Sequence, residues 1–403
     1  MDLKIKTKQY FDFPKSLVFM IEEIKNKFKL IYGNSPESIF FCPGRVNLMG
    51  EHLDYNGGLV MPSCISLGTF LAISPNHDCK FRLKSLNRGE EMDYLIGENI
   101  EKKGSDWLNY PLGILKFLQE KGFGIGGYNL LYGGNIPLSS GLSSSASLEI
   151  VTIFSLVSLM NLPLNKLEMI LMAKRLENEF IGLQSGIMDQ FSVTMGEKDR
   201  AMVLNCQSLE LDYIQFPLGD HKLVILNTQK PRELSDSKYN ERVKECLMAL
   251  EIFQTKYPIQ NLCELNPFQF ESSKNLIQAP SINKRAKHII YENERVKLSK
   301  EILSKGDLPG FGKIMYESHN SLKLDYEVSG LELDTLISFC QKQSYVLGAR
   351  MTGAGFGGCA IALVPKEYLN QFEMDIQKDY TEKIGYPLGF YTSEIEDGVI
   401  QYQ

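Results

Sequence analysis

The chain of 403 residues alternates short apolar runs with longer amphipathic windows, and this alternation predicts its secondary structure. Short runs rich in β-branched or aromatic residues and bounded by turn residues are typical of strands. Six windows have that pattern: Ile39–Cys42, Gly68–Ile73, Tyr128–Tyr132, Ala201–Leu204, Lys222–Leu226 and Cys359–Val364. Four longer windows predict helices: Ser143–Met160, Lys166–Phe180, Arg285–Lys300 and Leu331–Lys342. Strands interspersed with helices indicate an α/β or α+β fold.

The length of the chain predicts two domains, because a single hydrophobic core stops growing at roughly 250–300 residues. We place the division in the turn-rich stretch that follows Asn205 and precedes the strand at Lys222. The predicted domains are residues 1–210 and 211–403, with a cleft between them. No internal repeat or low-complexity segment suggests another organisation.

Composition excludes several classes of protein. The hydrophobic fraction of 43% and the charged fraction of 23% are ordinary for a folded globular chain. A net charge of −6 without a basic block argues against a nucleic-acid partner. No apolar run reaches the ~18 residues of a membrane span, and Met1–Lys6 lacks the apolar core of a signal peptide. We therefore expect a cytoplasmic protein without a membrane partner.

The cysteines give no sign of a metal or disulfide framework. All eight are scattered, without a Cys-x-x-Cys pair, and most have apolar neighbours. Free cysteine is among the residue types most often buried. We expect reduced, packed thiols.

A loop of small residues, Pro137–Ala146, leads into the predicted helix Ser143–Met160. That helix is apolar almost all round, as in helices buried within a core. A helix N-terminus presents unpaired N–H groups and the positive end of a dipole, and small side chains allow close approach of an anion. The pattern favours a phosphate site, although a serine-capped helix would have the same pattern. It is not a Walker loop, since no G-x-x-x-x-G-K-[ST] occurs.

Two acidic residues occupy positions where apolar residues are expected. Glu177 follows Ile170 by seven residues and Ala173 by four, which places it on the inner face of its helix. A buried carboxylate needs a metal or an arginine, whereas a helix-end charge could reach solvent. Asp189 lies among apolar residues in Gly186–Phe191. It is a candidate general base or a helix-capping residue.

The segment Gly44–Gly58 concentrates polar side chains between glycines directly after a predicted strand. It contains Arg45, Glu51, His52 and Asp54. Ionised carboxylates accept strong hydrogen bonds from hydroxyl groups, so the segment suits a polyhydroxylated ligand. His52 by itself would suit a packing role.

Together these segments resemble the GHMP small-molecule kinases, and in particular the galactokinase branch of that family. Gly44–Gly58 resembles the galactokinase signature at all but two positions, Met49 and Leu53. Pro137–Ala146 is similar to the family's phosphate loop, and Gly353–Gly358 to its third, glycine-rich motif. Further matches occur at Glu177–Gly182, Gly186–Gln190, Asn227–Tyr239, Glu292–Arg295 and Glu317–His319.

The resemblance implies a ribosomal protein S5 domain 2-like N-terminal domain, a ferredoxin-like C-terminal domain and an active site between them. It implies transfer of the γ-phosphoryl group of ATP to the anomeric hydroxyl of galactose, which gives galactose 1-phosphate and ADP. That reaction is the first committed step of galactose breakdown in the Leloir pathway. The implied ligands are galactose, ATP as co-substrate and Mg²⁺. We expect a monomer, with a weak homo-oligomer as the alternative.

The resemblance also implies roles for individual residues. Asp189 matches the catalytic acid and Arg45 its stabilising neighbour. The implied sugar contacts are Glu51, His52, Leu53, Asp54, Gly186 and Tyr239. The implied nucleotide contacts are Ser139, Ser140, Gly141, Leu142, Ser143, Ser144 and Ser145, with serine at 139 where galactokinases usually have glycine. Ser145 and Glu177 match the magnesium ligands.

These residue types agree with phosphoryl transfer, which depends on positioning and on neutralising negative charge. Glu51 and Asp54 are the expected determinants of sugar choice, because a carboxylate rejects an epimer that leaves it unpaired. A related kinase for N-acetylgalactosamine or arabinose is the first alternative. A sugar sensor without turnover is the second, but the complete run Ser143–Ser147 and the presence of Asp189 favour turnover.

Overall fold

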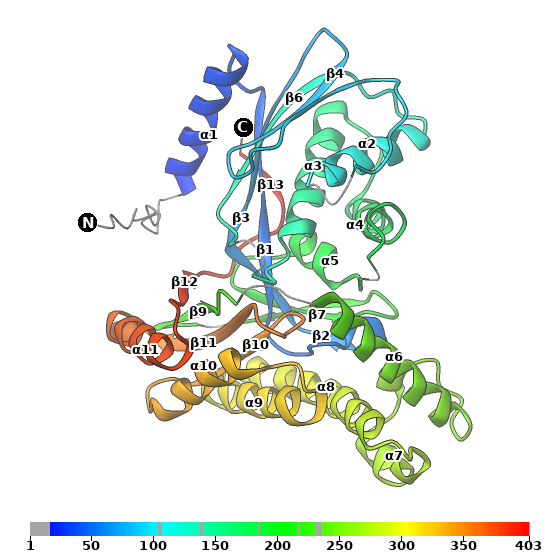
Figure 1. Ribbon diagram of the computed structural model, residues 1–403, viewed down its shortest axis with the longest axis vertical. Coiled ribbons are helices and arrows are strands. Elements are labelled where there is room, and N and C mark those ends of the chain that lie inside the picture. The colour runs from blue at the N-terminus through cyan, green and yellow to red at the C-terminus, as the bar shows by residue number, and fades with distance from the viewer. Residues whose placement is uncertain are drawn as a thin grey trace, which may run out of the picture.

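The computed structural model describes residues 17–103, 107–137, 140–183, 185–216, 218–230 and 235–402. Within these ranges the strands form three sheets, with helices packed on their faces (Figure 1). The largest sheet has six strands in the order β13-β1-β3-β6-β4-β5. Its strands are β1 (Ser38–Asn47), β3 (Pro62–Pro75), β4 (Lys80–Ser85), β5 (Met92–Leu95), β6 (Tyr128–Gly134) and β13 (Ile400–Gln401).

Helices cover both faces of the six-stranded sheet, and the alternation of side chains along β1 explains how (Figure 1). Ile39 and Phe41 belong to an apolar cluster with helix α1 (Leu17–Tyr32), whereas Phe40 and Cys42 point into the opposite cluster. That second face carries α2 (Asn109–Glu120), α3 (Ser144–Met160), α4 (Lys166–Arg175) and α5 (Met188–Met195). All of β1 is therefore buried.

The second sheet has four antiparallel strands in the order β10-β11-β9-β12. They are β9 (His221–Asn227), β10 (Gly348–Thr352), β11 (Cys359–Pro365) and β12 (Gly389–Ser393). Helices separate β9 from β10 and β11 from β12, which gives the β-α-β-β-α-β arrangement of ferredoxin-like domains. The helices of this half are α6 (Ser235–Gln254), α7 (Pro267–Glu271), α8 (Pro280–Ser304), α9 (Leu308–Ser321), α10 (Leu331–Lys342) and α11 (Leu369–Ile384).

A small third sheet joins the two halves. It consists of β2 (Leu59–Val60), β7 (Arg200–Asn205) and β8 (Leu211–Gln215), in the order β2-β7-β8. The predicted division between residues 210 and 211 falls inside the β7–β8 hairpin, where Leu204 pairs with Leu211. The end of the chain also returns to the first sheet, because β13 pairs with β1. The domain limits proposed from the sequence stay a prediction.

The elements predicted from the sequence are found with one notable difference. Each of the six strand windows lies inside a strand, and α10 spans Leu331–Lys342 as expected. The predicted helix Lys166–Phe180 is α-helical only to Arg175 and continues as a π-helical turn, η2 (Leu176–Ile181). In this turn the N–H of Gly182 bonds to the carbonyl of Glu177, five residues earlier. The wider turn carries Glu177, and π-turns are frequent at functional sites.

Short helical turns complete the fold. These are η1 (Asp54–Asn56), η3 (Leu262–Glu264), η4 (Lys274–Leu276), η5 (Leu322–Tyr326) and η6 (Lys366–Tyr368). Across the residues that the structure describes, no helix has both the length and the apolar character needed to span a bilayer.

Candidate active site

Arg45 connects the end of β1 to a carboxylate far away in the sequence. Its Nε and Nη2 donate to Oδ1 of Asp189 at 2.9 and 2.6 Å, and its Nη1 donates to the carbonyl of Gly141 at 2.6 Å. Arg45 is 5% exposed and the Asp189 side chain 32% exposed, so the aspartate is the partner that stays open to a ligand. The guanidinium therefore holds the predicted catalytic acid beside the predicted phosphate loop.

Asp189 stands in the first turn of α5, as a helix-capping residue would. Its carboxylate nevertheless bonds away from its own helix, since Oδ1 accepts from Arg45 and Oδ2 accepts from the Ser143 hydroxyl at 2.7 Å. Both oxygens are fixed by residues of other elements. The aspartate therefore lies against the loop before α3.

The loop before α3 has the tight backbone expected of an anion-binding turn. Gly141 and Ser143 have φ of 75° and 61°, and Ser143 is the residue that precedes the first turn of α3. A Cβ on Gly44 would lie 2.6 Å from the carbonyl oxygen of Leu142, so glycine at position 44 lets this loop rest on β1. Ser139 lies outside the described residues.

The serines of the loop differ in exposure. Ser140 is 2% exposed, and within the described part of the chain its hydroxyl has no hydrogen-bond partner. Ser144 is exposed and Ser145 is partly buried, both in the first turn of α3, where backbone N–H groups have no partner within the helix. Leu142 is buried. From Ser140 to Ser145 the loop offers hydroxyl and N–H groups to a ligand and contains no acidic residue.

The acidic part of the first motif folds into the turn η1. Asp54 begins this turn, and a Cβ placed on Gly186 would come within 1.9 Å of its Oδ2. Gly186 is therefore the residue that makes room for the Asp54 carboxylate. Burial, followed by the negative charges of Asp189 and Glu51, raises the pKa of Asp54 to about 7. Among the charged groups, Asp189 and Glu51 act most strongly on the Asp54 carboxyl.

Glu51 is 2% exposed and bonds to two distant parts of the fold. Its Oε2 accepts from Nδ2 of Asn47 at 3.0 Å, and its Oε1 accepts from the backbone N–H of Gly353 at 2.7 Å. Gly353 opens the third, glycine-rich motif. The Glu51 carboxylate thus bonds the first motif to the third.

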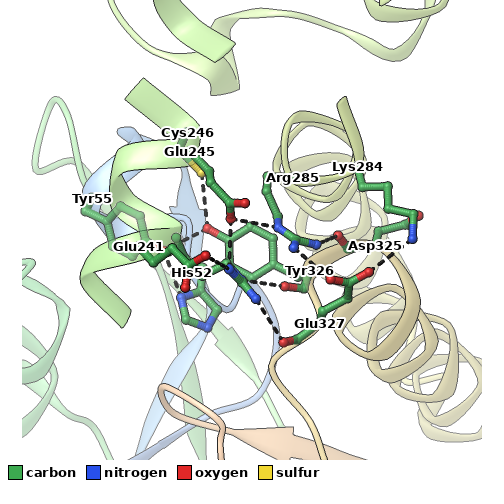
Figure 2. A network of polar contacts seen from close by, with 11 residues as sticks. His52, Tyr55, Glu241, Glu245, Cys246, Lys284, Arg285, Asp325, Tyr326 and Glu327 are labelled. Carbon is green, nitrogen blue, oxygen red and sulfur yellow. Dashed lines mark hydrogen bonds and ion pairs between the residues drawn. The ribbon is translucent and has the colours of Figure 1, made fainter. Parts of the chain in front are cut away.

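His52 lies in a chain of hydrogen-bonded side chains. Its Nδ1 is 2.9 Å from the Tyr55 hydroxyl, which is 2.8 Å from the Tyr326 hydroxyl (Figure 2). Burial, with the charge of His288 second, lowers the pKa of His52 to about 3, so the imidazole is neutral. The side chain of Leu53, by contrast, is fully buried in the apolar core. Its place among the predicted sugar contacts rests only on its position between His52 and Asp54.

Charged side chains connect α6, η5 and α8 next to these hydrogen-bonded residues (Figure 2). Arg285 of α8 bonds to Glu245 of α6 at 2.9 Å and to Glu327 at 2.8 Å. Arg242 of α6 donates to the carbonyl of Tyr326 at 2.8 Å. The network fixes the end of α6 that carries Tyr239.

Tyr239 faces the same group of residues as the first motif. Its ring centre is 5.9 Å from that of His52 and 5.5 Å from that of Tyr55. Burial, then the charge of Asp54 and that of Asp189, raises the pKa of Tyr239. Tyr239 comes from a separate motif and thus lies beside His52, another predicted sugar contact.

Glu177 and Ser145 meet at the mouth of α3 beside a second buried carboxyl. Glu177 is 4% exposed, and burial raises the pKa of its carboxyl, an effect that the nearby Ser185 and Ser145 hydroxyls oppose. Glu149 is fully buried, and burial followed by the charge of Glu177 raises its pKa as well. Ser185 donates to Glu177 and Gln190 donates to Glu149, and both donors are uncharged. Because the raised pKa values favour the protonated carboxyls, a cation bound here would favour their ionised forms.

Two residues of the site were missed from the sequence. Glu149 is the charged residue within the apolar helix Ser143–Met160, and Arg350 is a charged residue within the buried strand β10. In each case a charge inside an apolar window was the available signal. Neither window contains a motif from which the partner of the charged residue could be predicted.

Three family models match this chain. A galactokinase galactose-binding signature matches residues 26–75, which include the first motif. The model of the GHMP kinase N-terminal domain matches residues 109–197, and that of the GHMP kinase C-terminal domain matches residues 299–380. These matches agree with the two-domain GHMP kinase fold expected from the sequence.

Known proteins give the same assignment. The chain is 47% identical over 382 residues to a galactokinase of Clostridium tetani, covering 94% of this chain and 97% of the relative. Its structure matches that of Lactococcus lactis galactokinase complexed with galactose, with a TM-score of 0.91, 43% identity and coverage of 95% and 100%. Methanococcus jannaschii mevalonate kinase shares the fold, with a TM-score of 0.66, 21% identity and coverage of 89% and 98%. The chain belongs to the galactokinase family of GHMP kinases.

Proposed function

We propose that this protein transfers the γ-phosphoryl group of ATP to the anomeric hydroxyl of galactose, yielding galactose 1-phosphate and ADP. The observation that carries this proposal is the placement of Asp189, whose two carboxylate oxygens bond to Arg45 and to Ser143. Arg45 comes from the motif with the predicted sugar contacts, and Ser143 from the phosphate loop. The acid therefore lies where a sugar hydroxyl and a nucleotide phosphate would meet.

Asp189 takes the proton of the anomeric hydroxyl in the proposed reaction. The sugar oxygen forms a bond to phosphorus, the bond from phosphorus to the ADP oxygen breaks, and the proton passes to the carboxylate. Each carboxylate oxygen has two lone pairs, so the contacts from Arg45 and Ser143 leave capacity for one more. The charge of Arg45 stabilises the negative charge that develops on the sugar oxygen.

The sugar would be recognised by the acids of the first motif and by Tyr239. Asp54 stands in the space that Gly186 leaves open, and Tyr239 packs beside His52. A carboxylate that accepts a hydrogen bond from a particular hydroxyl rejects an epimer because it is left unpaired in a desolvated site. Asp54 and Glu51 are the residues that we propose for this discrimination.

The phosphates of ATP would lie on the loop before α3. The first turn of this helix offers unpaired N–H donors and the positive end of the helix dipole, which stabilise anions. The hydroxyls of Ser144 and Ser145, and that of Ser140, which has no partner among the described residues, would add further donors. Arg45 holds the loop through the carbonyl of Gly141.

Ser145 and Glu177 fit a magnesium ion. Mg²⁺ prefers oxygen ligands and is usually held by one or two protein carboxylates together with waters and substrate phosphates. Among the described residues, no group of three or more His, Cys, Asp and Glu side chains could hold a metal ion by itself. Phosphate and water oxygens would supply the other ligands of an ion held by Ser145 and Glu177. When bound, Mg²⁺ would neutralise charge on the phosphates. Glu177 and Ser145 would orient it, and Glu149 and Ser185 would hold Glu177 in place.

A coupled ADP-release assay with a panel of sugars tests the proposal. Galactose should give the highest kcat/KM among galactose, N-acetylgalactosamine and arabinose. Preference for N-acetylgalactosamine would instead assign the related sugar kinase activity. Tight binding of galactose without ADP release would assign a sensor.

A further inference from the structure

Arg350 is a fully buried arginine in β10, between Ala349 and Met351. Its Nη1 donates to the carbonyl of Asn47 at 3.1 Å. Its Nη2 is 3.8 Å from Oε1 of Glu51 and 3.8 Å from Oε1 of Glu292. Within the described residues its Nε and Nη2 make no hydrogen bond, so its other donors are not fully satisfied. A buried charge of this kind is costly to folding, which indicates that it serves another purpose.

The two carboxylates beside Arg350 differ in how they are held. Burial alone would raise the pKa of Glu292, but the positive charges of Arg295, His288 and Arg350 lower it to about 2. Glu292 also accepts from Arg295 at 2.6 Å and from the N–H of Gly50 at 3.0 Å. Among the described residues, Arg350 is the cation that pairs with Glu51, at 3.8 Å, which is longer than a hydrogen bond. Loss of Arg350 should therefore disturb the position of Glu51 more than that of Glu292, which keeps its bond to Arg295.

Glu51 in turn holds the beginning of the third motif. Its Oε1 accepts from the N–H of Gly353, while its Oε2 accepts from Asn47. The following residues include a run with left-handed backbone, Gly355 to Gly358, with φ between 60° and 133°. Such a backbone depends on contacts from outside for its shape. The bond from Glu51 fixes its first residue.

The third motif lies directly on the phosphate loop. A Cβ added to Gly353 would be 3.1 Å from the carbonyl oxygen of Gly141, and one added to Gly358 would be 3.1 Å from that of Ser140. The two backbones are therefore in close contact at both ends of the motif. A shift of Gly353 would change the surface against which the phosphate loop rests.

We propose that Glu51 couples the sugar site to the nucleotide site, and that Arg350 is the positioning residue that keeps Glu51 in place for this purpose. Glu51 holds Gly353 against the phosphate loop even when no sugar is bound. Its loss then weakens nucleotide binding as well as sugar binding. The part concerning the sugar rests on the proposed function, whereas the part concerning the nucleotide rests on the contacts of Glu51 alone. By linkage, a sugar that strengthens the Glu51 contact also strengthens nucleotide binding.

The first test measures binding of ADP with Mg²⁺ by titration calorimetry, in the absence of sugar, to Glu51→Ala and Asp54→Asn proteins. Alanine has no side-chain acceptor, so the bonds from both Asn47 and Gly353 are lost, whereas glutamine could keep the Gly353 bond through its amide oxygen. We expect Glu51→Ala to weaken ADP binding by about 10-fold. Asp54→Asn changes the same motif without removing either of these bonds and should alter ADP binding by less than about 2-fold. Equal ADP affinity of the two variants would overturn the proposal.

The second test separates positioning from general stability. Arg350→Met and Arg295→Met each remove an arginine beside Glu292, but Arg350 is the one that also faces Glu51. Both should lower the melting temperature, while Arg350→Met alone should weaken ADP binding, with partial recovery in Arg350→Lys. Loss of thermal stability without any change in ADP affinity in the Arg350 variants would overturn the assignment. Because ADP binding is measured directly, a failure to phosphorylate galactose would count against the proposed function and not against this coupling.

Discussion

Arg45 donates two hydrogen bonds to the same oxygen of Asp189, from Nε at 2.9 Å and from Nη2 at 2.6 Å, across a sequence separation of 144 residues. The third nitrogen of the guanidinium bonds to Gly141 in the phosphate loop. This fork geometry is specific to arginine, whose planar group can address a carboxylate and a carbonyl at once. The orientation of the acid thus depends on the side chain that also fixes the loop.

Replacement of Arg45 by lysine should therefore impair the chemical step. A lysine keeps the charge but cannot make all three contacts, so we expect kcat to fall by about 100-fold, with smaller changes in KM for either substrate. Steady-state kinetics with galactose and ATP measures both constants. Arg200→Lys, at an exposed ion pair with Glu197, is the matched control and should behave as the unaltered protein. A raised KM with unchanged kcat in Arg45→Lys would assign Arg45 to binding only.

Alanine at position 186 should block the sugar site. Its Cβ would come within 1.9 Å of the Asp54 carboxylate, which must then move. We expect KM for galactose to rise by about 10-fold or more, with ADP affinity unchanged, because the clash is confined to the first motif. Gly126→Ala is the control, since a Cβ there meets no atom within 4 Å. Similar KM values in the two variants would show that Gly186 leaves no functional space.

The ionisation of Asp54 should make the free protein less stable at high pH. Its pKa is about 7 in the folded protein against an ordinary value of 3.8, so the folded state binds more protons between these values. Stability from this group is then greatest at low pH and is lost as pH rises through about 7. Asn at this position removes the buried charge, so Asp54→Asn should melt higher than the unaltered protein at pH 8 and by a smaller margin at pH 5.

Melting curves followed by circular dichroism at the two pH values check this expectation. Glu90→Gln, a surface acid, serves as the control and should leave the pH dependence unchanged. An equal difference in melting temperature at pH 5 and pH 8 for Asp54→Asn would exclude ionisation of Asp54 as the cause.

Removal of Glu177 should raise the magnesium requirement of the reaction. Glu177→Ala loses a proposed metal ligand, so half-maximal activity should need about 10-fold more Mg²⁺, with partial recovery at high concentration. Glu179 lies in the same π-helical turn, but its carboxylate is exposed and pairs with Arg175. Glu179→Ala is therefore the control. Magnesium titrations that coincide for the two variants would remove Glu177 from the metal site.

Much of this site could be predicted because its residues carry local signals. The strands and helices follow from hydrophobic period, and Glu177 and Asp189 stand out as acids in apolar surroundings. The family resemblance adds roles to those positions. A local sequence pattern does not show which distant residue a side chain will contact, however. The hydrogen bond between Glu51 and Gly353, for example, spans 302 residues. Such contacts arise only when both halves fold together.

The same reason explains what was missed. Glu149 interrupts the apolar window predicted as a helix, and Arg350 lies in β10, which is not among the predicted strands. The π-helical turn after Arg175 was also not predicted, because its backbone hydrogen bonds depend on the left-handed Gly182 and on the packing of Glu177 against α3 and α5. The turn-rich stretch after Asn205 forms the connection between β7 and β8, in which Leu204 pairs with Leu211.

The most direct test of the central claim is identification of the product by ³¹P NMR after incubation of the protein with galactose, ATP and Mg²⁺. The arrangement of Asp189, Arg45 and the phosphate loop predicts a single new sugar phosphate, with its phosphorus coupled to the anomeric proton of galactose, and no detectable product from an Asp189→Asn protein. A phosphate on another hydroxyl of galactose, or full product formation by Asp189→Asn, would contradict it.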